Sequence, residues 1–216
     1  NMVAIAHQYY LLHPNFPHPK RLSFDRFLVN LNSKITALGA NKKLALSFTE
    51  FREDYRNQIR AVPPLLRKEI TAYHLTENDR SDFLYAEQLI EWHQQNDETV
   101  IHCFWSNTAF GRVHRVNENL TFHQIDAELF LMMMVSCKAF VSTAGFESIC
   151  EAFYLGKPCC MVPLPKHYEQ ACNAIDAQLA GVGIAQENFD FSGFMTYLSA
   201  NKQTSNKDFN AWVCEA

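Results

Sequence analysis

The sequence predicts an α/β fold in which a parallel sheet is flanked by helices. Short apolar, β-prone runs alternate with amphipathic helical patterns along most of the 216 residues. Four of the seven glycines fall within residues 138–183, where the pattern reads strand, tight turn, helix, strand, loop, helix. That order is typical of a parallel-sheet unit whose first turn faces a ligand.

The central unit is expected to begin with a short buried strand at residues 139–142. A small-residue turn interrupts it at residues 143–145, and apolar side chains then recur at helical spacing over residues 146–155. Gly156 and Pro158 follow in the order expected at a helix C-terminus. The next buried strand is predicted at residues 159–162.

This turn predicts a seat for a phosphate group. A helix that starts directly after a parallel strand has backbone N–H groups without partners at the positive end of its dipole. The residues that would form the seat belong to the turn and to the first helical turn. They are Thr143, Ala144, Gly145, Phe146 and Ser148.

Glu151 is the predicted ribose ligand. Glu147 and Glu151 are four residues apart and therefore share one face of the helix. From Gly145 to Glu151 the helix advances roughly 9 Å at about 1.5 Å per residue, which is the reach from a diphosphate to the ribose of the same nucleotide. A carboxylate offers two acceptor oxygens, and a ribose offers two neighbouring hydroxyl donors.

These residues resemble the nucleotide-sugar half of GT-B glycosyltransferases, above all the bacterial N-acetylglucosaminyl transferase of peptidoglycan synthesis and the plant and bacterial UDP-glycosyltransferases. The motifs that carry the resemblance are Gly145, Glu151, the Gly-Lys-Pro stop, Val162-Pro163 and the segment 169–174. It implies a Rossmann-like donor domain over residues 63–216, preceded by a partial acceptor-side α/β segment over residues 1–62. It also implies transfer of a sugar from a UDP-sugar to an acceptor hydroxyl with inversion.

The resemblance assigns binding roles to further residues. It places Glu151 on the ribose, and Glu169 with Gln170 on the hydroxyls of the donor sugar. The uracil is expected against the backbone near His123 and Gln124. No cofactor and no metal ion are implied besides the UDP-sugar substrate, because the helix amides would stabilise the departing diphosphate.

One departure from the family pattern affects the site, and two further residues are expected near the cleft. Thr143 stands where many members have a phosphate-binding His, so that contact would fall to backbone amides and to the hydroxyl of Thr143 or Ser148. Arg67, near the expected interdomain linker, could reach the donor phosphate across the cleft. The catalytic base is not identified, and His7 at a strand end is the only histidine expected near the cleft.

The chain is expected to supply mainly the donor-binding half of an enzyme. About 60 residues before the linker are too few for a complete Rossmann-like half. A missing N-terminal domain or a partner subunit would then complete the acceptor site, and the acceptor itself is unknown. Two alternatives stay open, namely a non-catalytic nucleotide-sugar-binding subunit of a split transferase and a sugar-nucleotide epimerase of the same fold.

Composition narrows the partners and the compartment. A formal net charge of −4 without a dense basic cluster argues against nucleic acid. No run reaches the roughly 20 apolar residues of a transmembrane helix. The seven cysteines lie in apolar runs without CxxC spacing, which favours reduced core thiols and no metal site. These features predict a cytoplasmic protein, and a position at the inner face of the membrane stays open as an alternative.

The remaining elements follow from periodicity and from helix stop signals. Residues 59–67, with a double proline, are expected to form the linker, and Asp126 is expected to cap a helix. Further strands are predicted at residues 2–7, 43–48, 70–75, 99–105, 120–125 and 184–185; helices at 24–38, 81–95, 127–137 and 191–198; a polar loop after residue 105; and a final turn at 209–213.

Overall fold

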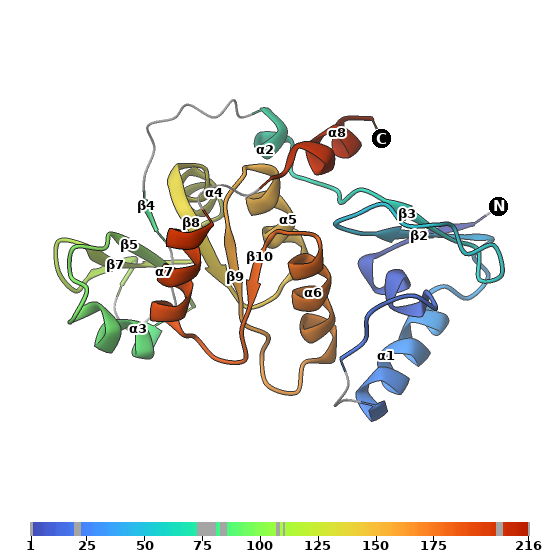
Figure 1. Ribbon diagram of the computed structural model, residues 1–216, viewed down its shortest axis with the longest axis horizontal. Helices are drawn as coiled ribbons and strands as arrows, with labels where there is room; N and C mark the ends of the chain where they lie inside the picture. The colour runs from blue at the N-terminus through green and yellow to red at the C-terminus, as the bar shows by residue number, and fades with distance from the viewer. Residues whose placement is uncertain are drawn as a thin grey trace.

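The computed structural model describes residues 2–19, 23–72, 81–82, 86–106, 109, 111–201 and 205–215. Among them are a three-stranded sheet and a seven-stranded sheet that share no strand. Figure 1 shows the smaller sheet beside the larger α/β unit, with the helix α6 (Tyr168–Leu179) of the larger unit facing the smaller one. The expected α/β class with parallel sheets flanked by helices is therefore confirmed.

The small sheet is parallel and has the order β1 (Val3–Ile5), β2 (Lys42–Leu46), β3 (Ile59–Val62). A 3-10 helix, η1 (His7–Leu12), follows β1, and α1 (Ser23–Thr36) leads into β2. The first strand is shorter than expected and lies at the sheet edge. Val3 and Ile5 are about half exposed, as suits a strand that pairs on one side only, with β2.

The large sheet has the order β10-β9-β8-β4-β5-β7-β6, and every neighbouring pair is parallel except β6 with β7. Its strands are β4 (Ser81–Asp82), β5 (Ile101–Trp105), β6 (Val113–Arg115), β7 (Leu120–Gln124), β8 (Cys137–Ser142), β9 (Cys159–Met161) and β10 (Gly183–Ala185). Gly183 is required for the pairing of β10 with β9, since an added Cβ would lie 1.8 Å from the carbonyl oxygen of Cys159.

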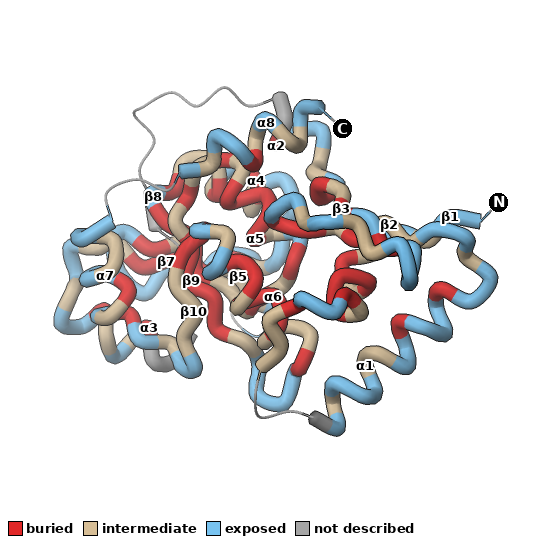
Figure 2. The backbone as a smooth tube through the Cα atoms, turned by 45° about the vertical axis from the view of Figure 1, so that its right-hand side comes forward, coloured by how far each residue is buried: buried red, intermediate tan, exposed pale blue. Residues whose placement is uncertain are grey.

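Helices cover both faces of this sheet (Figures 1 and 2). One apolar cluster packs α4, α5, α6 and α8 against it, and a second packs α3 and α7. The helices are α2 (Lys68–Ala72), α3 (Ala86–His93), α4 (Ala127–Ser136), α5 (Phe146–Tyr154), α6 (Tyr168–Leu179), α7 (Phe191–Ala200) and α8 (Lys207–Glu215). The predicted cap of α4 is confirmed, because the Asp126 carboxylate accepts the Leu129 N–H at 2.9 Å.

The segment between the two sheets differs most from expectation. Residues 59–62 form β3, so the connection begins only at Pro63. The strand predicted at residues 70–75 is wrong in its described part, where α2 forms. The helix predicted at residues 81–95 begins later, because Ser81 and Asp82 pair in the sheet. Residues 73–80 and 83–85 lie outside the described part.

No helix in the described ranges is long and apolar enough to cross a membrane. No group of three or more His, Cys, Asp or Glu side chains that could hold a metal ion occurs in these ranges either. All seven cysteines are free thiols, and six of them are buried.

Candidate functional site

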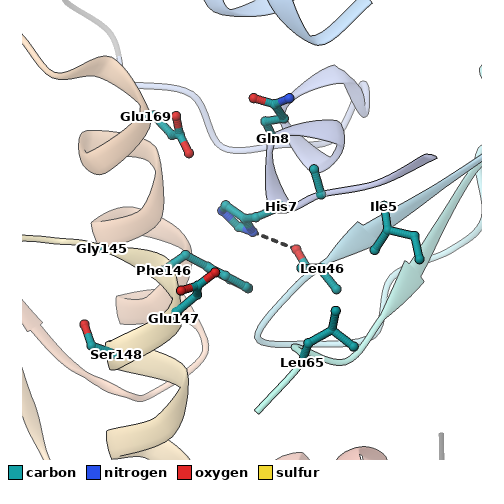
Figure 3. A pocket seen from close by; sticks show the side chains of 11 residues that line it. Ile5, His7, Gln8, Leu46, Leu65, Gly145, Phe146, Glu147, Ser148 and Glu169 are labelled. Atoms are coloured by element: carbon teal, nitrogen blue, oxygen red, sulfur yellow. Dashed lines mark hydrogen bonds between the residues drawn. The ribbon is translucent and has the colours of Figure 1, made fainter. Parts of the chain in front are cut away.

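A cavity of about 650 Å³ lies where the small sheet meets the starts of α5 and α6 (Figure 3). Its wall contains residues of the small unit, which holds β1, β2 and β3, residues of the large unit, which holds the seven-stranded sheet, and Leu65 of the connection between them. The lining residues are Ile5, Ala6, His7, Gln8, Leu46, Leu65, Gly145, Phe146, Glu147, Ser148 and Glu169. Of the residues predicted for the site, the structure brings His7, Gly145, Phe146, Ser148 and Glu169 together here.

The open amino end of α5 forms one side of the cavity. Gly145 is the N-cap and has no capping side chain, so the N–H groups of the first helical turn have no intrahelical acceptor. The turn before it is held from α6, where the Asn173 side-chain amide donates to the Ala144 carbonyl at 2.9 Å. Such an end attracts anions through its amides and its dipole.

Thr143 and Ala144 belong to this turn but do not line the cavity. Ala144 is fully buried, and the Thr143 carbonyl accepts the Gly145 N–H at 2.5 Å. The Ser142 hydroxyl donates to the same carbonyl at 2.7 Å. The contact predicted for both residues with a diphosphate stays a prediction.

His7 lies against the start of α5. Its ring stacks on Phe146 with centroids 3.8 Å apart, and only 6% of the residue is exposed. Nδ1 is 2.6 Å from the Leu46 carbonyl oxygen. Because that oxygen can only accept, Nδ1 carries the hydrogen and Nε2 carries the lone pair of the neutral ring. Burial lowers the pKa of His7 to about 4, which makes the neutral form dominant near pH 7.

Two carboxylates line the cavity. Glu147 is exposed in the first turn of α5, and Glu169 is partly exposed in the first turn of α6. The α6 end is fixed by its cap, because the His167 ring accepts the Gln170 N–H at 3.3 Å. It is also tied to the small unit, where Nδ1 of His18 lies 2.6 Å from the Tyr168 hydroxyl oxygen.

Gln170 does not line the cavity, in contrast to its neighbour Glu169. Its side-chain carbonyl accepts the Leu164 N–H at 2.8 Å and so closes the loop before α6. The donor-sugar contact predicted for Gln170 therefore stays a prediction. It would have to be made by the side-chain NH2 group of Gln170, because the side-chain carbonyl already accepts from Leu164.

Arg67 and Glu151 are engaged with each other. Nε and Nη2 of Arg67 donate to the two carboxylate oxygens of Glu151 at 2.5 and 2.6 Å. The Glu151 side chain is 6% exposed and that of Arg67 is 37% exposed. The carboxylate raises the pKa of Arg67 through this bond. Neither residue lines the cavity, so their predicted contacts with ribose and phosphate would require the pair to open.

The predicted base-binding residues lie further along the sheet. His123 and Gln124 are the last residues of β7. In the sheet, β7 is three strands away from β8, the strand that leads into α5. At about 4.8 Å per strand, the two strands are about 14 Å apart. Nε2 of His123 is 2.9 Å from Nδ1 of His102, and burial lowers the pKa of His123. Neither residue lines the cavity, and their contact with a uracil stays a prediction.

The sequence did not predict six residues of the wall, namely Ile5, Ala6, Gln8, Leu46, Leu65 and Glu147. Glu147 could have been found, because it lies two residues after Gly145 in the first turn of the predicted helix. Gln8 and Leu65 could not, since their place depends on how the two sheets pack.

Comparison with known proteins points to one family. The sequence model described as glycosyl transferase family 1 matches residues 1–200. No curated protein matches the sequence. The chain is similar to the solved GT-B structure of the spinosyn forosaminyltransferase SpnP, with a TM-score of 0.51 and 12% identity over 99% of this chain and 64% of that chain. For the calicheamicin glycosyltransferase CalG4 the TM-score is 0.56 and the identity 12%, over 88% of this chain and 52% of that chain. For Arabidopsis thaliana UGT89C1 in complex with UDP-L-rhamnose the TM-score is 0.54 and the identity 12%, over 99% of this chain and 60% of that chain.

These comparisons confirm the expected GT-B class of the fold. At 12% identity the similarity to the solved structures concerns the fold alone. The chain also spans only 52% to 64% of their length.

Proposed function

The chain belongs to glycosyl transferase family 1, and on this premise we propose that it binds the nucleotide-sugar donor of a sugar-transfer reaction. The donor is a UDP-sugar, and the chain supplies mainly the donor-binding half of the enzyme. The observation that carries the proposal is the uncapped amino end of α5, which opens into a cavity between the two α/β units.

The diphosphate would bind at this end. The N–H groups of Phe146, Glu147 and Ser148 have no intrahelical acceptor there, and the Ser148 hydroxyl lines the same wall. Preorganised amides stabilise the charge that the leaving diphosphate gains in the transition state. Glu147 places a negative charge beside this seat, so the ligand oxygens would have to approach the amides from the side away from its carboxylate.

The donor sugar would be held by Glu169, whose carboxylate lies on the wall of the cavity next to the α5 end. Sugar hydroxyls donate to carboxylate oxygens, and such charge-assisted bonds orient the anomeric carbon. Gln170 would join through its side-chain N–H groups. The uracil would lie toward the ends of β5 and β7, near His123 and Gln124.

Glu151 would reach the ribose only after Arg67 leaves it. The two predictions for these residues are compatible with one rearrangement, in which the ribose hydroxyls replace the guanidinium on Glu151. Arg67, on the connection between the sheets, would then be available for the diphosphate. In this arrangement the Glu151 carboxylate would accept hydrogen bonds from the two neutral ribose hydroxyls, and the Arg67 guanidinium would pair with the diphosphate, so each charged group would keep hydrogen-bond partners.

Sugar transfer with inversion would proceed by attack of an acceptor hydroxyl on the anomeric carbon. The bond from that carbon to the diphosphate oxygen breaks, and the bonding electrons leave with UDP. The acceptor proton passes to a base. His7, whose pKa is lowered to about 4, is a weak proton acceptor for a hydroxyl, so we assign the base to a group of the acceptor-binding part. No metal step is part of the proposal.

A thermal-shift panel tests the proposal. UDP, GDP, dTDP, UDP-glucose and UDP-N-acetylglucosamine are compared, with and without EDTA. Ligands that bind the folded state raise Tm according to their affinity, so UDP and at least one UDP-sugar are expected to raise it with EDTA present. If no nucleotide raises Tm, the donor-binding function is wrong. If GDP or dTDP raises it more than UDP does, the donor class is wrong.

A further inference from the structure

Two buried polar atoms beside the cavity have no hydrogen-bond partner, namely Nε2 of His7 and Oδ1 of Asn173. The other polar atom of each side chain is already committed. Nδ1–H of His7 donates to the Leu46 carbonyl, and Nδ2–H of Asn173 donates to the Ala144 carbonyl. His7 is 6% exposed and Asn173 is 2% exposed. A buried polar atom left without a partner destabilises the folded state.

Both atoms are acceptors while the imidazole is neutral, so neither can satisfy the other. A proton on Nε2 would change this, because the imidazolium donates from both nitrogens. The Asn173 side chain already acts on the His7 ring in the direction that favours the protonated form. The result would be a continuous series of hydrogen bonds from Leu46 through His7 and Asn173 to the Ala144 carbonyl, directly before the N-cap of α5.

Charge decides whether the proton is present. In the unliganded protein, burial outweighs the hydrogen bonds and lowers the pKa of His7 to about 4. The titratable groups facing the same cavity are Glu147 on α5 and Glu169 on α6. Deeper on α6, burial raises the pKa of Asp176 to about 7, and Arg67 on the connection is paired with Glu151. Thr143, in the turn itself, carries no charge.

An anion at the amino end of α5 would add negative charge next to the ring. The ring stacks on Phe146, the first residue of that helix. At such short range and partly shielded from water, an opposite charge favours the charged form of a histidine.

We propose that His7 takes up a proton from solvent when the donor diphosphate binds at the α5 amino end, and that the imidazolium, hydrogen-bonded to Leu46 and Asn173, compensates the charge of the diphosphate. The inference rests on the proposed function. It makes His7 a charge-compensating residue at the start of α5, to which its ring is joined by the stack on Phe146. As charge develops on the leaving group, the imidazolium would stabilise it further.

Calorimetric titration with UDP-glucose tests this directly. Both phosphates of UDP-glucose are diesterified or anhydride-linked, so the ligand has no phosphate monoester that titrates near pH 6. Binding is measured at pH 6.5 in two buffers with different enthalpies of ionisation, and the difference gives the number of protons taken up. Net uptake of a substantial fraction of one proton per site is expected.

The pH dependence has a defined sign. A pKa that is higher in the complex than in the free protein makes binding tighter as the pH falls through the higher value. The limiting slope for one proton is about tenfold in affinity per pH unit. The gain ends near the free-state pKa of about 4.

His7→Phe keeps an aromatic ring on Phe146 and removes the site of protonation, so the uptake and the His7-dependent rise in affinity are expected to vanish. His7→Gln, which can still donate to Leu46, serves if the Phe variant folds poorly. His114→Gln on β6, outside the cavity lining, is the control and should retain the uptake. Circular dichroism and thermal unfolding establish that each variant is folded.

The outcomes separate the two proposals. UDP-glucose binding with proton uptake in the wild type and in His114→Gln, but not in the His7 variants, supports the inference. Binding with no uptake and a flat pH profile overturns the inference and leaves the donor site standing. Uptake that persists in both His7 variants also overturns it. Absence of binding overturns the proposed function, and this inference with it.

Discussion

Arg67 and Glu151 form a two-pronged ion pair that joins the connection between the two sheets to the helix of the proposed diphosphate site. The partners are 84 residues apart in sequence, and the carboxylate is almost completely buried. The pair therefore fixes the connection to α5 in the unliganded protein. It also occupies the carboxylate that we propose for the ribose.

Arg67→Ala is expected to destabilise the protein by about 3–5 kcal/mol, because it leaves a buried carboxylate without its partner. The unfolding free energy is measured in urea at pH 7. The double variant Arg67→Met with Glu151→Leu should recover most of the loss, since apolar side chains of similar size fill the same space without a charge. A loss below about 1 kcal/mol for Arg67→Ala would mean that the pair behaves as a surface ion pair.

Glu151→Ala is expected to weaken UDP binding by about 1–3 kcal/mol, the cost of charge-assisted hydrogen bonds to the ribose. Calorimetry measures the affinity, and Glu118→Ala, at an exposed position between β6 and β7, is the control. Equal UDP affinity in the wild type and in Glu151→Ala would reject the ribose assignment and leave the carboxylate as a partner of Arg67 alone.

Asp176 is expected to make the protein less stable as the pH rises. Its carboxylate is 4% exposed, Oδ2 has no partner, and burial raises its pKa from 3.8 to about 7. A raised carboxyl pKa favours the folded state below the unfolded value, and this advantage is lost between about pH 4 and pH 7. At about 1.4 kcal/mol per pKa unit, the free energy of unfolding should fall by on the order of 4 kcal/mol across this pH range.

Asp176→Asn should remove this pH dependence. Urea unfolding at pH 5 and pH 8 is compared for the wild type and the variant, with Asp97→Asn as a surface control. The wild type should lose stability between the two pH values, whereas Asp176→Asn should change far less. Parallel pH profiles for the wild type and Asp176→Asn would show that Asp176 stays ionised without cost.

The apolar face of α1 is expected to cause association of the chain. This face points to solvent instead of the core, although its spacing is that of an amphipathic helix. The exposed side chains are Phe24 at 69%, Phe27 at 60%, Leu28 at 45%, Leu31 at 44% and Ile35 at 58%, and Leu38, in the turn after the helix, is 77% exposed. An apolar face of this kind marks a surface that another segment or subunit covers.

Phe27→Lys with Ile35→Glu should lower light scattering and binding of an apolar dye, while the unfolding free energy changes by less than about 0.5 kcal/mol per site. Dynamic light scattering at several concentrations provides the measurement. A wild-type chain that stays monomeric at high concentration and binds no dye would contradict the expectation. So would a double variant that unfolds.

The central unit could be predicted from sequence because local signals define it. The turn before Phe146, the Gly156 stop and the apolar run of β9 agree with the structure to within about two residues. Gly156 has φ of 69°, a conformation that glycine adopts without strain, so its role as a helix stop is local as well.

Contacts between side chains that are far apart in the sequence could not be predicted. Arg67 and Glu151 each have the chemistry of a nucleotide ligand, and only the packing of the connection on α5 shows that they pair. The stacking of His7 on Phe146 depends on the same packing. The helix α2 was missed because a helix of 5 residues is too short for its periodicity to show in the sequence, and β6 was missed because its residues are mostly exposed.

The central claim is that the open amino end of α5 binds the donor diphosphate, and backbone amide NMR tests it most directly. Uniformly ¹⁵N-labelled protein is titrated with UDP-glucose, and the assigned amide signals are followed. We predict the largest downfield shifts at Phe146, Glu147 and Ser148, whose N–H groups would bond to phosphate oxygens. Saturable binding that leaves these three amides unshifted, while amides elsewhere move, would contradict the account.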